Sequence, residues 1–412
     1  MWNRKIDEFL VKIGFHRLES DHSIYLRSPS GSTHKGNVVK NLANTAKNDI
    51  YDIVALYVDD LILLTKTKAS MTTLKNDLSK SFEMTDCGEI HHFLGINATR
   101  DRSRRSISLD QSHFATNVVD RFGLTNCHPV STPLDPSIKL VADAPQSPHQ
   151  ASVEGENASE KSSDELVDPT FYRQIVGSLM YLMIGTRPDL AAAIGIISQF
   201  SANPRKSHLG AAKRILRYLK GTINLKLKLG NATTATATTA ATADPATTIK
   251  ISGYSDANWG NDINTRRSTS GYIFYIAGGV VSWSSKRQAT VALSSTEAEY
   301  MALTHATKET VWLRALLGEL GFHQGDPSTI FEDNQSCIAL ARNPVHHART
   351  KHIDIRHHYI REKLESGEVT LRYVNTKEMV ADAFTKPLPK PQFEFLVGLM
   401  NLCTEDGATR LA

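Results

Sequence analysis

The spacing of apolar residues predicts helices through much of the first half of the chain. The N-terminal apolar residues recur at helical spacing, at Trp2, Ile6, Phe9, Leu10 and Ile13. Residues three and four positions apart share one face of a helix, so this segment is predicted to be amphipathic. The same period predicts helices over residues 70–82, 111–122, 169–184, 189–200 and 207–219. Residues 93–111 predict a hairpin with a charged tip.

In the second half, short strands alternate with helices. A strand over residues 249–255 is predicted to end at Asp256, and Ser294 with Glu297 has the spacing of a capping box that begins a long helix. This helix is expected to run to about Leu317. The remaining predicted elements are a hairpin of residues 271–276 and 280–284 across Gly278 and Gly279, a strand over 329–332 ending at Asp333, a helix before Pro344, a helix carrying Ile353, Ile360 and Leu364, a strand over 369–373 and a final helix bearing Asp382.

Two adjacent aspartates interrupt an apolar run in the stretch ALYVDDLILL, residues 55–64. A carboxylate buried without a partner costs several kcal/mol, so Asp59 and Asp60 need either solvent or a cation. A hairpin tip between the two apolar segments is one interpretation, because aspartate favours turns. A metal ion is the other, and both hold if the tip directs the carboxylates at the ion.

Length and composition limit the classes of protein to which the chain can belong. With 412 residues the chain is long enough for two or three domains, and its 41% hydrophobic and 22% charged residues are ordinary for a soluble globular protein. No apolar run has the roughly 20 residues of a membrane span, and the N-terminus is not a signal peptide. We therefore expect an intracellular protein that is not secreted. Its four cysteines are far apart, which disfavours a disulfide framework and a zinc finger.

Two segments of biased composition divide the chain. Residues 141–168 are rich in Ser, Glu, Asp, Ala and Pro and predict an exposed, disordered insertion. Residues 231–248 are largely Thr and Ala and predict a linker. The net charge is only +4, but basic residues cluster in four places. One such cluster is usually solvated surface, whereas four clusters interleaved with acids favour a nucleic-acid partner.

Four acidic residues stand where strands end or helices begin. Such positions can converge at one edge of a sheet although they lie far apart in the sequence. Four oxygen donors suit Mg²⁺, and two ions about 3.5–4 Å apart can promote phosphodiester cleavage. Each acid alone has a simpler explanation as a cap or a turn residue. The acids in question are Asp256, Glu299, Asp333 and Asp382.

Ordered motifs then point to a family. YSDANWGND, RRSTSGYIF, SWSSKRQATVALSSTEAEYMAL, EDNQSCIALARNPVHHARTKHIDIRHHYIRE and VADAFTKPL resemble the ribonuclease H domain of copia-type retrotransposon polyproteins. LYVDDLILL, FLGI, GSLMYLMIGTRPDL and RILRYLKGT resemble the reverse transcriptase and connection that precede it. The resemblance implies an α/β (mixed α+β) fold: part of a reverse-transcriptase palm with a helical thumb and connection, then a ribonuclease H-like domain with a mixed five-stranded sheet flanked by helices.

The resemblance implies boundaries for these parts. They are a palm part and the start of the thumb over residues 1–140, the insertion at 141–168, a helical thumb and connection over 169–230, the linker at 231–248, a ribonuclease H domain over 249–390 and a C-terminal tail at 391–412.

The motifs also imply site residues. Asp256, Glu299, Asp333 and Asp382 resemble the catalytic, metal-binding set for two Mg²⁺ ions, with Mn²⁺ as a substitute. Glu297 competes with Glu299. We prefer Glu299 because EYMA resembles the pattern around the catalytic glutamate of cellular ribonucleases H, and because the two positions point to different sides of a helix. Glu297 would instead close the capping box.

Basic and amide groups are expected to bind the nucleic acid. They are Lys286, Arg287, Gln288, Arg349 and Lys351. Ser255, Asn258 and Trp259 flank the first acid and are expected to shape the groove wall. A histidine-rich run could suggest a zinc site, but no cysteines accompany it. We prefer to interpret these histidines as part of a basic helix that lies against nucleic acid, or as core residues with satisfied hydrogen bonds. That run comprises His346, His347, His352, His357 and His358. The histidine that often precedes the last aspartate in cellular enzymes is absent from NTKEMVA.

For the polymerase part, Asp59 and Asp60 resemble two of three catalytic carboxylates and their metal ligands. No matching motif for the third lies upstream, so we expect RNA-directed DNA polymerase activity to be absent from this chain alone. Expected partners are RNA–DNA hybrid, template RNA and DNA, and other Pol or Gag products, with no membrane, in a cytoplasmic virus-like particle or the nucleus. A noncatalytic nucleic-acid-binding relic is the alternative, and an integrase is disfavoured because the motifs match the ribonuclease.

Overall fold

The computed structural model describes residues 2–28, 52–142, 165–230, 249–343 and 354–404, except for the side chains of 354–357. The low-complexity linker at 231–248 and most of the insertion at 141–168 lie outside the described residues. The chain divides into two units. The first comprises residues 1–91, 243–251 and 308–328, and the second comprises the rest. The expected mixed α/β fold is confirmed in both.

The first unit is built on an antiparallel sheet of order β1-β2-β3-β4. The sheet is accompanied by two helices whose apolar faces fill one core, in which Ile6, Leu10, Tyr25, Val54 and Leu74 are fully buried. The predicted N-terminal amphipathic helix is confirmed, and so is the helix expected over 70–82. The elements are α1 (Trp2–Lys12), β1 (His16–Arg17), β2 (Ile24–Arg27), β3 (Asp52–Tyr57), β4 (Asp60–Leu64) and α3 (Lys68–Ser81).

The two aspartates of ALYVDDLILL stand at the turn between β3 and β4. Tyr57 pairs with Asp60, which leaves Val58 and Asp59 as the two-residue loop. Val58 has φ 53°, a left-handed conformation that a β-branched residue rarely adopts. The Trp2 indole donates a 2.7 Å hydrogen bond to the Val58 carbonyl and supports this turn. The hairpin interpretation is confirmed.

A second sheet, of order β14-β8-β7-β6-β5, belongs to the second unit. The hairpin expected over 93–111 is confirmed as β6 and β7, with the basic run at its tip. Its strands are β5 (His92–Phe93), β6 (Ile96–Asp101), β7 (Ser106–Asp110), β8 (Lys226–Leu229) and β14 (Leu402–Cys403). Residues 391–403, placed by the sequence in a tail, instead form helix α12 (Lys390–Leu399) and β14, whose apolar side chains Phe393, Leu396 and Leu402 are buried.

Helices pack beside this sheet around an extensive hydrophobic core. Asp168 caps the second of them by accepting hydrogen bonds from the amides of Thr170 and Phe171. All four predicted helical segments are confirmed to within a few residues. The helices are α4 (Ser112–Arg121), α5 (Pro169–Gly185), the 3-10 turn η2 (Pro188–Leu190) leading into α6 (Ala191–Ser198), and α7 (Lys206–Gly221).

A buried polar network joins η2 to the end of α7. The Arg187 guanidinium forms two hydrogen bonds with the Asp189 carboxylate, of 2.9 and 2.7 Å. Tyr218 donates a third hydrogen bond to that carboxylate, and Thr222 accepts from Arg187 through both its carbonyl and its hydroxyl. Every group of the network therefore has a partner, which is the condition under which a buried charge pair is tolerated.

The third sheet has the order β11-β10-β9-β12-β13. Strands β10 and β11 pair antiparallel, and β12 runs parallel to β9. A parallel neighbour needs a crossover, and helix α8 lies in the chain between β11 and β12. The elements are β9 (Ile251–Asn258), β10 (Thr269–Ile276), β11 (Gly279–Arg287), α8 (Ser295–Glu319), β12 (Ser328–Glu332), α9 (Gln335–Arg342), α10 (Asp354–Glu365), β13 (Val369–Tyr373), η6 (Thr376–Glu378) and α11 (Asp382–Thr385).

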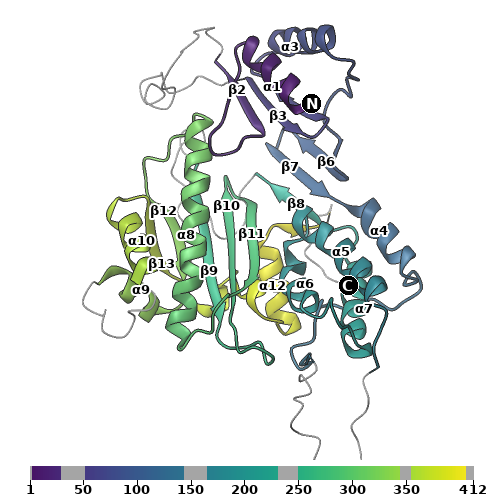
Figure 1. Ribbon diagram of the computed structural model, residues 1–412, viewed down its shortest axis with the longest axis vertical. Helices are drawn as coiled ribbons and strands as arrows, with labels where there is room; N and C mark the ends of the chain where they lie inside the picture. Colours follow the sequence, from purple (N-terminus) through teal and green to yellow (C-terminus); the bar gives the residue numbers. More distant parts are fainter. Residues whose placement is uncertain (1, 29–51, 143–164, 231–248, 344–353, 405–412) are drawn as a thin grey trace, which may run out of the picture. The chain divides into compact units, whose positions relative to one another are not determined.

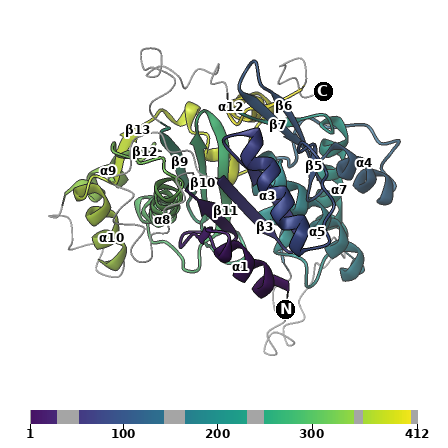
Figure 2. The same cartoon turned by 90° about the horizontal axis from the view of Figure 1, so that it is seen from above.

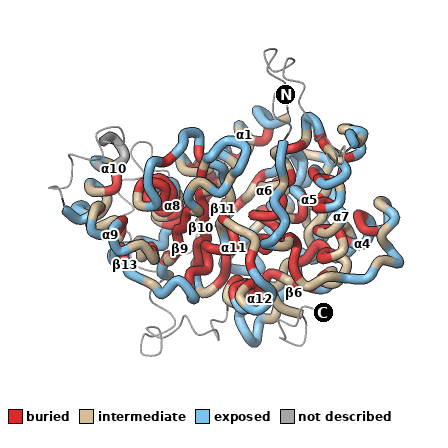
Figure 3. The backbone as a smooth tube through the Cα atoms, turned by 90° about the horizontal axis from the view of Figure 1, so that it is seen from below, coloured by how far each residue is buried: buried red, intermediate tan, exposed pale blue. Residues whose placement is uncertain are grey.

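The N-terminal part of α8 packs closely on β9 through small side chains. Ala298, Met301 and Ala302 of the helix form a buried cluster with Ala257 of the strand. Figure 3 accordingly shows long stretches of β9, β10 and α8 in the red of buried residues. Figure 2 shows α8 nearly end-on beside β9 and β12. The close approach brings the first turns of α8 to the strand that carries Asp256.

Three predictions about these elements need correction. Strand β9 does not end at Asp256 but continues to Asn258, because Ala257 is buried under α8 and extends the apolar pattern. The hairpin turns at Ala277 and Gly278, with φ 50° and 79°, because Ile276 pairs with Gly279. Two positive φ values suit a two-residue turn of type I′. The helix bearing Asp382 is a single short turn and not the last helix.

Candidate metal centre

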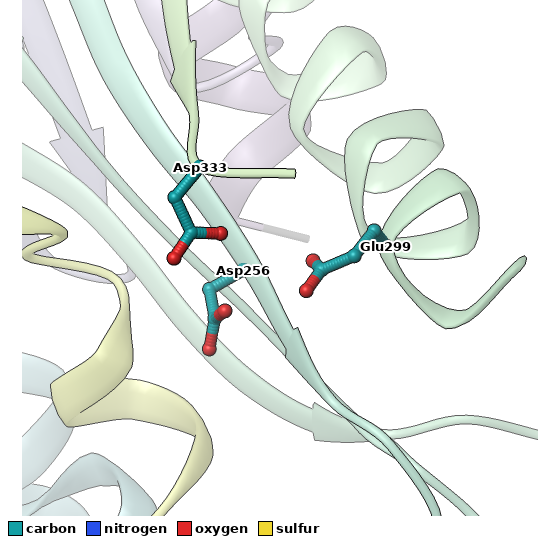
Figure 4. A group of neighbouring side chains, drawn as sticks. All are labelled: Asp256, Glu299 and Asp333. Atoms are coloured by element: carbon teal, nitrogen blue, oxygen red, sulfur yellow. The ribbon is translucent and has the colours of Figure 1, made fainter. Parts of the chain in front are cut away.

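Three carboxylates from separate elements meet at the third sheet. Asp256 lies on β9, Glu299 near the start of α8, and Asp333 directly after β12. Figure 4 shows the three side chains directed toward one another. One ligand oxygen from each lies within 4.8 Å of the others. Asp256 and Glu299 are buried, whereas Asp333 is partly exposed, so the cluster is open to solvent on the Asp333 side.

The backbone of β9 holds the glutamate in this position. The amide of Ala257 donates a 2.7 Å hydrogen bond to Glu299 Oε2. Glu297 turns elsewhere: its carboxylate accepts a 2.7 Å hydrogen bond from the Leu293 amide, while its own amide donates to Ser294 Oγ. The structure therefore places Glu299 in the cluster and Glu297 at the cap of the helix. In a standard capping box the glutamate would accept from the amide of the N-cap residue, Ser294, but here it accepts from the amide of Leu293, one residue earlier.

Asp382 joins the same centre from the other side. Thr385, one turn later on α11, donates a hydrogen bond to Asp256 Oδ2. The Lys386 ammonium lies 2.7 Å from Asp382 Oδ1. The charge of Asp382 is close enough to Asp256 to shift its pKa. The four acids predicted from the motifs are thus brought together, three in one tight group and Asp382 beside Asp256.

A glycine allows α11 to come this close. Gly271 of β10 faces α11, and a Cβ atom at that position would lie 2.8 Å from both Phe384 Cβ and Thr385 Cγ2. Real Cβ contacts are not that short, so any side chain there would push α11 away. The glycine of the motif RRSTSGYIF therefore fixes the distance between Asp382 and the sheet.

Burial and mutual repulsion raise the pKa values of the cluster. Burial, with the charge of Asp382 added, raises the pKa of Asp256 to about 7. The pKa of Glu299 lies well above its usual range because of burial and the charge of Asp256. Burial also raises the pKa of Asp382, although Lys386 opposes that shift. Without a cation the carboxylates are hard to ionise together.

This donor set fits a hard divalent cation. Mg²⁺ and Mn²⁺ prefer carboxylate oxygens, and a cation would relieve the repulsion that raises these pKa values. Asp256, Glu299, Asp333 and Asp382 would supply the ligands. A bound ion would favour the ionised carboxylates, so metal binding would release protons from the cluster.

Two charged residues of this centre were missed by sequence reasoning. Glu332 precedes Asp333 and is fully buried; burial, with the charge of Asp256 added, raises its pKa well above the usual range. The only sequence signal was its place at the end of the predicted strand, directly before Asp333. Lys386 was missed because an i,i+4 pair with Asp382 is common and uninformative without the structure.

The residues predicted to bind nucleic acid differ in their exposure and contacts. Lys286 is exposed at the end of β11. Arg287 donates 2.8 Å hydrogen bonds to Asp262 and to Gln199. Gln288 needs correction: it is buried, and its amide nitrogen donates to Ser270 Oγ and to the Ala298 carbonyl, so its role is structural. Arg349 and Lys351 lie outside the described residues.

The residues flanking Asp256 also differ in burial. Ser255 is fully buried, whereas Asn258 is partly buried and its side-chain amide donates a hydrogen bond to the Thr385 carbonyl. Trp259 is exposed. Of the histidine-rich run, only His358 has a described side chain, and it lies exposed on α10.

Asp59 and Asp60 are both exposed at the β3–β4 turn. Within the described part of the chain they belong to no group of three side chains able to ligate one ion; the one such group is that of Asp256, Glu299 and Asp333.

Comparisons with known proteins agree with the motifs. The family described as reverse transcriptase (RNA-dependent DNA polymerase) matches residues 1–136. The retrovirus-related Pol polyprotein from transposon TNT 1-94 of Nicotiana tabacum is 38% identical over 97% of this chain and 27% of its own length. A transposon Ty5-1 protein of Saccharomyces cerevisiae is 30% identical over 75% of this chain and 84% of its own length.

A solved structure of LC11-RNase H1, isolated from compost, is also similar. It is 16% identical, with a TM-score of 0.27, over 33% of this chain and 92% of its own. The chain spans about a quarter of the length of the plant Pol polyproteins that it matches. None of the described helices is both long and apolar enough to cross a bilayer.

Proposed function

We propose a nuclease function for this chain, which belongs to the family of retrovirus-related Pol polyproteins of copia-type transposons. The chain hydrolyses phosphodiester bonds in the RNA strand of an RNA–DNA hybrid. The observation that carries the proposal is the convergence of Asp256, Glu299 and Asp333 within 4.8 Å, with Asp382 beside them. A reverse transcriptase generates such a hybrid, because it leaves the template RNA paired with the new DNA strand.

The reaction adds the oxygen of a water molecule to phosphorus and breaks the bond between phosphorus and the 3′ oxygen. The proton lost by the water is balanced by one gained at the 3′ oxygen, so the products are a 5′ phosphate and a 3′ hydroxyl. Two Mg²⁺ ions, when bound, would activate the water and stabilise the leaving oxygen. The cofactor assignment rests on the oxygen-only donor set.

The protein groups hold this arrangement rigid. Ala257 and Thr385 each donate a hydrogen bond to a carboxylate of the centre, so Glu299 and Asp256 cannot rotate freely. Burial of both acids keeps competing water from their inner sides. Positioning of this kind matters because a misplacement of about 1 Å can reduce a rate about 10²-fold.

The test is cleavage of a hybrid labelled on its RNA strand. We expect Mg²⁺-dependent cleavage by the purified chain, and a loss of at least about 10²-fold in Asp256→Asn. The same RNA paired with RNA serves as the substrate control. If parent and variant cleave equally, a contaminating nuclease is responsible. If neither cleaves but both bind the hybrid, the noncatalytic relic is the better description.

For the polymerase part we propose that the chain alone does not extend a primer. Two exposed aspartates at one turn supply two carboxylates, and none of the other described acids groups with them. A polymerase needs both ions placed. Mg²⁺-dependent primer extension on an RNA template, lost in Asp60→Asn, would contradict this proposal.

A further inference from the structure

An exposed tryptophan lies three residues after Asp256. The side chain of Trp259 is 56% exposed, although its indole nitrogen is fixed by a 2.9 Å hydrogen bond to the Ala292 carbonyl. A tryptophan whose polar atom is satisfied while its ring faces solvent presents a rigid apolar surface. The ring is therefore held in place but not covered.

Two aliphatic side chains flank the point where the indole is anchored. Val291 is 47% exposed and Leu293 is 75% exposed, one on each side of Ala292. Single exposed apolar residues are ordinary, but a group around one anchored ring indicates a binding surface. We call Trp259, Val291 and Leu293 the apolar step.

The apolar step is tied to the start of α8 at both of its segments. On β9, the amide of Ala257 is bonded to Glu299, two residues before Trp259. On the other segment, the amide of Leu293 is bonded to Glu297 at the start of α8. A strand of nucleic acid held at the acids would therefore meet a surface that is hydrogen-bonded to the helix that carries Glu299.

Unpaired cations lie at the same end of the sheet. The loop that follows Trp259 carries exposed Arg266, and the amide of Gly260 in this loop is bonded to Ser268 just before β10. Lys286 pairs in register with Ser270 at the start of β10. Among the residues that the structure describes, neither Arg266 nor Lys286 has an acidic partner. The charge next to the apolar step thus complements a polyanion.

We propose that the apolar step packs against sugar and base faces of the nucleic acid whose phosphate is held at the acidic centre, and that Trp259 positions that strand. The inference rests on the proposed nuclease function and adds to it the residues that hold the substrate. Aromatic rings stack on bases with little regard to sequence, which suits an enzyme that must cut at many positions. Lys286 and Arg266 would contact the phosphates.

The experiment measures binding of an RNA–DNA hybrid in an Asp256→Asn background, where the RNA stays intact. Trp259→Ala should weaken binding about tenfold, with the dependence on salt concentration unchanged, because stacking releases no counterions. Lys286→Ala should weaken binding less at high salt and reduce the slope against salt by about one. Leu293→Ser should weaken binding in the same salt-independent way as Trp259→Ala.

Two further variants separate ring packing from a structural role of the indole. Trp259→Phe keeps an aromatic ring but loses the hydrogen bond to Ala292, and we expect it to retain most of the affinity. Trp312→Phe is the matched control, because Trp312 is 39% exposed and also donates to a backbone carbonyl, that of Ser20, in the other unit. Adding hybrid should quench indole fluorescence in the parent and in Trp312→Phe, but much less in Trp259→Phe.

The outcomes distinguish this inference from the function on which it rests. If the hybrid binds equally well to Trp259→Ala and to its parent, the inference is wrong and the nuclease proposal stands. Equal weakening in Trp259→Ala and Trp259→Phe would also overturn it, since the indole would then act only by anchoring residues 291–293. If the parent binds hybrid through Trp259 but the unmodified chain does not cleave it, the nuclease proposal fails alone. A parent that binds no hybrid overturns both.

Discussion

Lys386 Nζ lies 2.7 Å from Asp382 Oδ1, so the cluster of acids contains a cation of its own. Burial would lower the pKa of Lys386, but the charges of Asp256 and Asp382 outweigh burial and raise it. The lysine is half-buried and stays charged at neutral pH. It thus compensates part of the charge that a metal ion would otherwise compensate.

Removing this lysine should have opposite effects on the metal-free and metal-bound protein. In Lys386→Gln we expect the metal-free chain to lose about 1–2 kcal/mol of unfolding free energy, between the values for exposed and buried pairs. Mg²⁺ should then bind more tightly and raise the melting temperature more than in the parent. Lys390→Gln, which removes the more exposed partner of Glu394, is the control. Unchanged Mg²⁺ affinity by calorimetry would contradict this prediction.

The two glutamates of the motif STEAEYM should separate by function. Glu299→Gln removes a carboxylate of the cluster and is expected to reduce the proposed hybrid cleavage at least about 10²-fold while the fold remains. Glu297→Gln should leave cleavage near the parent rate but cost about 1 kcal/mol, because it weakens the cap of α8. Cleavage rates and thermal denaturation of both variants test this. A greater loss of activity in Glu297→Gln than in Glu299→Gln would reverse the assignment.

The raised pKa of Asp256, about 7, predicts how metal-free stability depends on pH. The folded-state value exceeds that of the unfolded chain, so protonation stabilises the fold. This contribution is complete below the unfolded value of about 4 and is lost as pH rises through about 7. Burial of Glu299 acts in the same direction.

We therefore expect the melting temperature without metal to fall between about pH 4 and 7 relative to that of Asp256→Asn. Stabilisation by Mg²⁺ should grow over the same interval, because the ion binds the ionised acids. Scanning calorimetry with and without Mg²⁺ measures both effects. A melting-temperature difference between parent and variant that stays constant from pH 4 to 7 would show that Asp256 titrates normally.

The buried pair of Arg187 and Asp189 should matter for stability. Asp189→Ala leaves the guanidinium without its partner in the core, and we expect a loss of about 3–5 kcal/mol, or roughly 10 °C in melting temperature. Glu165→Ala is the control, because Glu165 and Lys206 form an equally short pair of 2.6 Å on the surface. We expect less than about 1 kcal/mol there. Equal effects would mean that distance, and not burial, decides the contribution.

Periodicity predicted most elements because their buried faces are regular. The apolar residues of α1, α3 and α7 repeat every three or four positions, and each of these helices lies within a few residues of its predicted range. The end of β9 could not be predicted in this way. The strand continues past Asp256 because α8 buries Ala257, and nothing local indicates that contact.

The acids of the candidate site could be predicted because they stand in recognisable motifs. Residues whose role depends on contacts between distant parts of the chain could not be predicted in this way. The four acids were named in advance, and the structure brings them together. Gln288 resembled a polar surface residue, but its amide is used between Ser270 and Ala298. The strands β8 and β14 are short, and their pairing joins residues 226–229 to residues 402–403, a contact too distant in sequence for any local pattern to show.

The acidic centre draws its parts from Asp256 on one strand to Asp382 near the end of the chain, with Glu299 and Asp333 between them. Synthesis proceeds from the N-terminus, so a ribosome-bound chain lacks the last ligand until α11 has emerged. A chain still attached to the ribosome would thus lack the complete centre that the proposed cleavage requires, even after its earlier elements have folded. Premature stop codons before residue 382 would likewise leave products without the complete acidic centre.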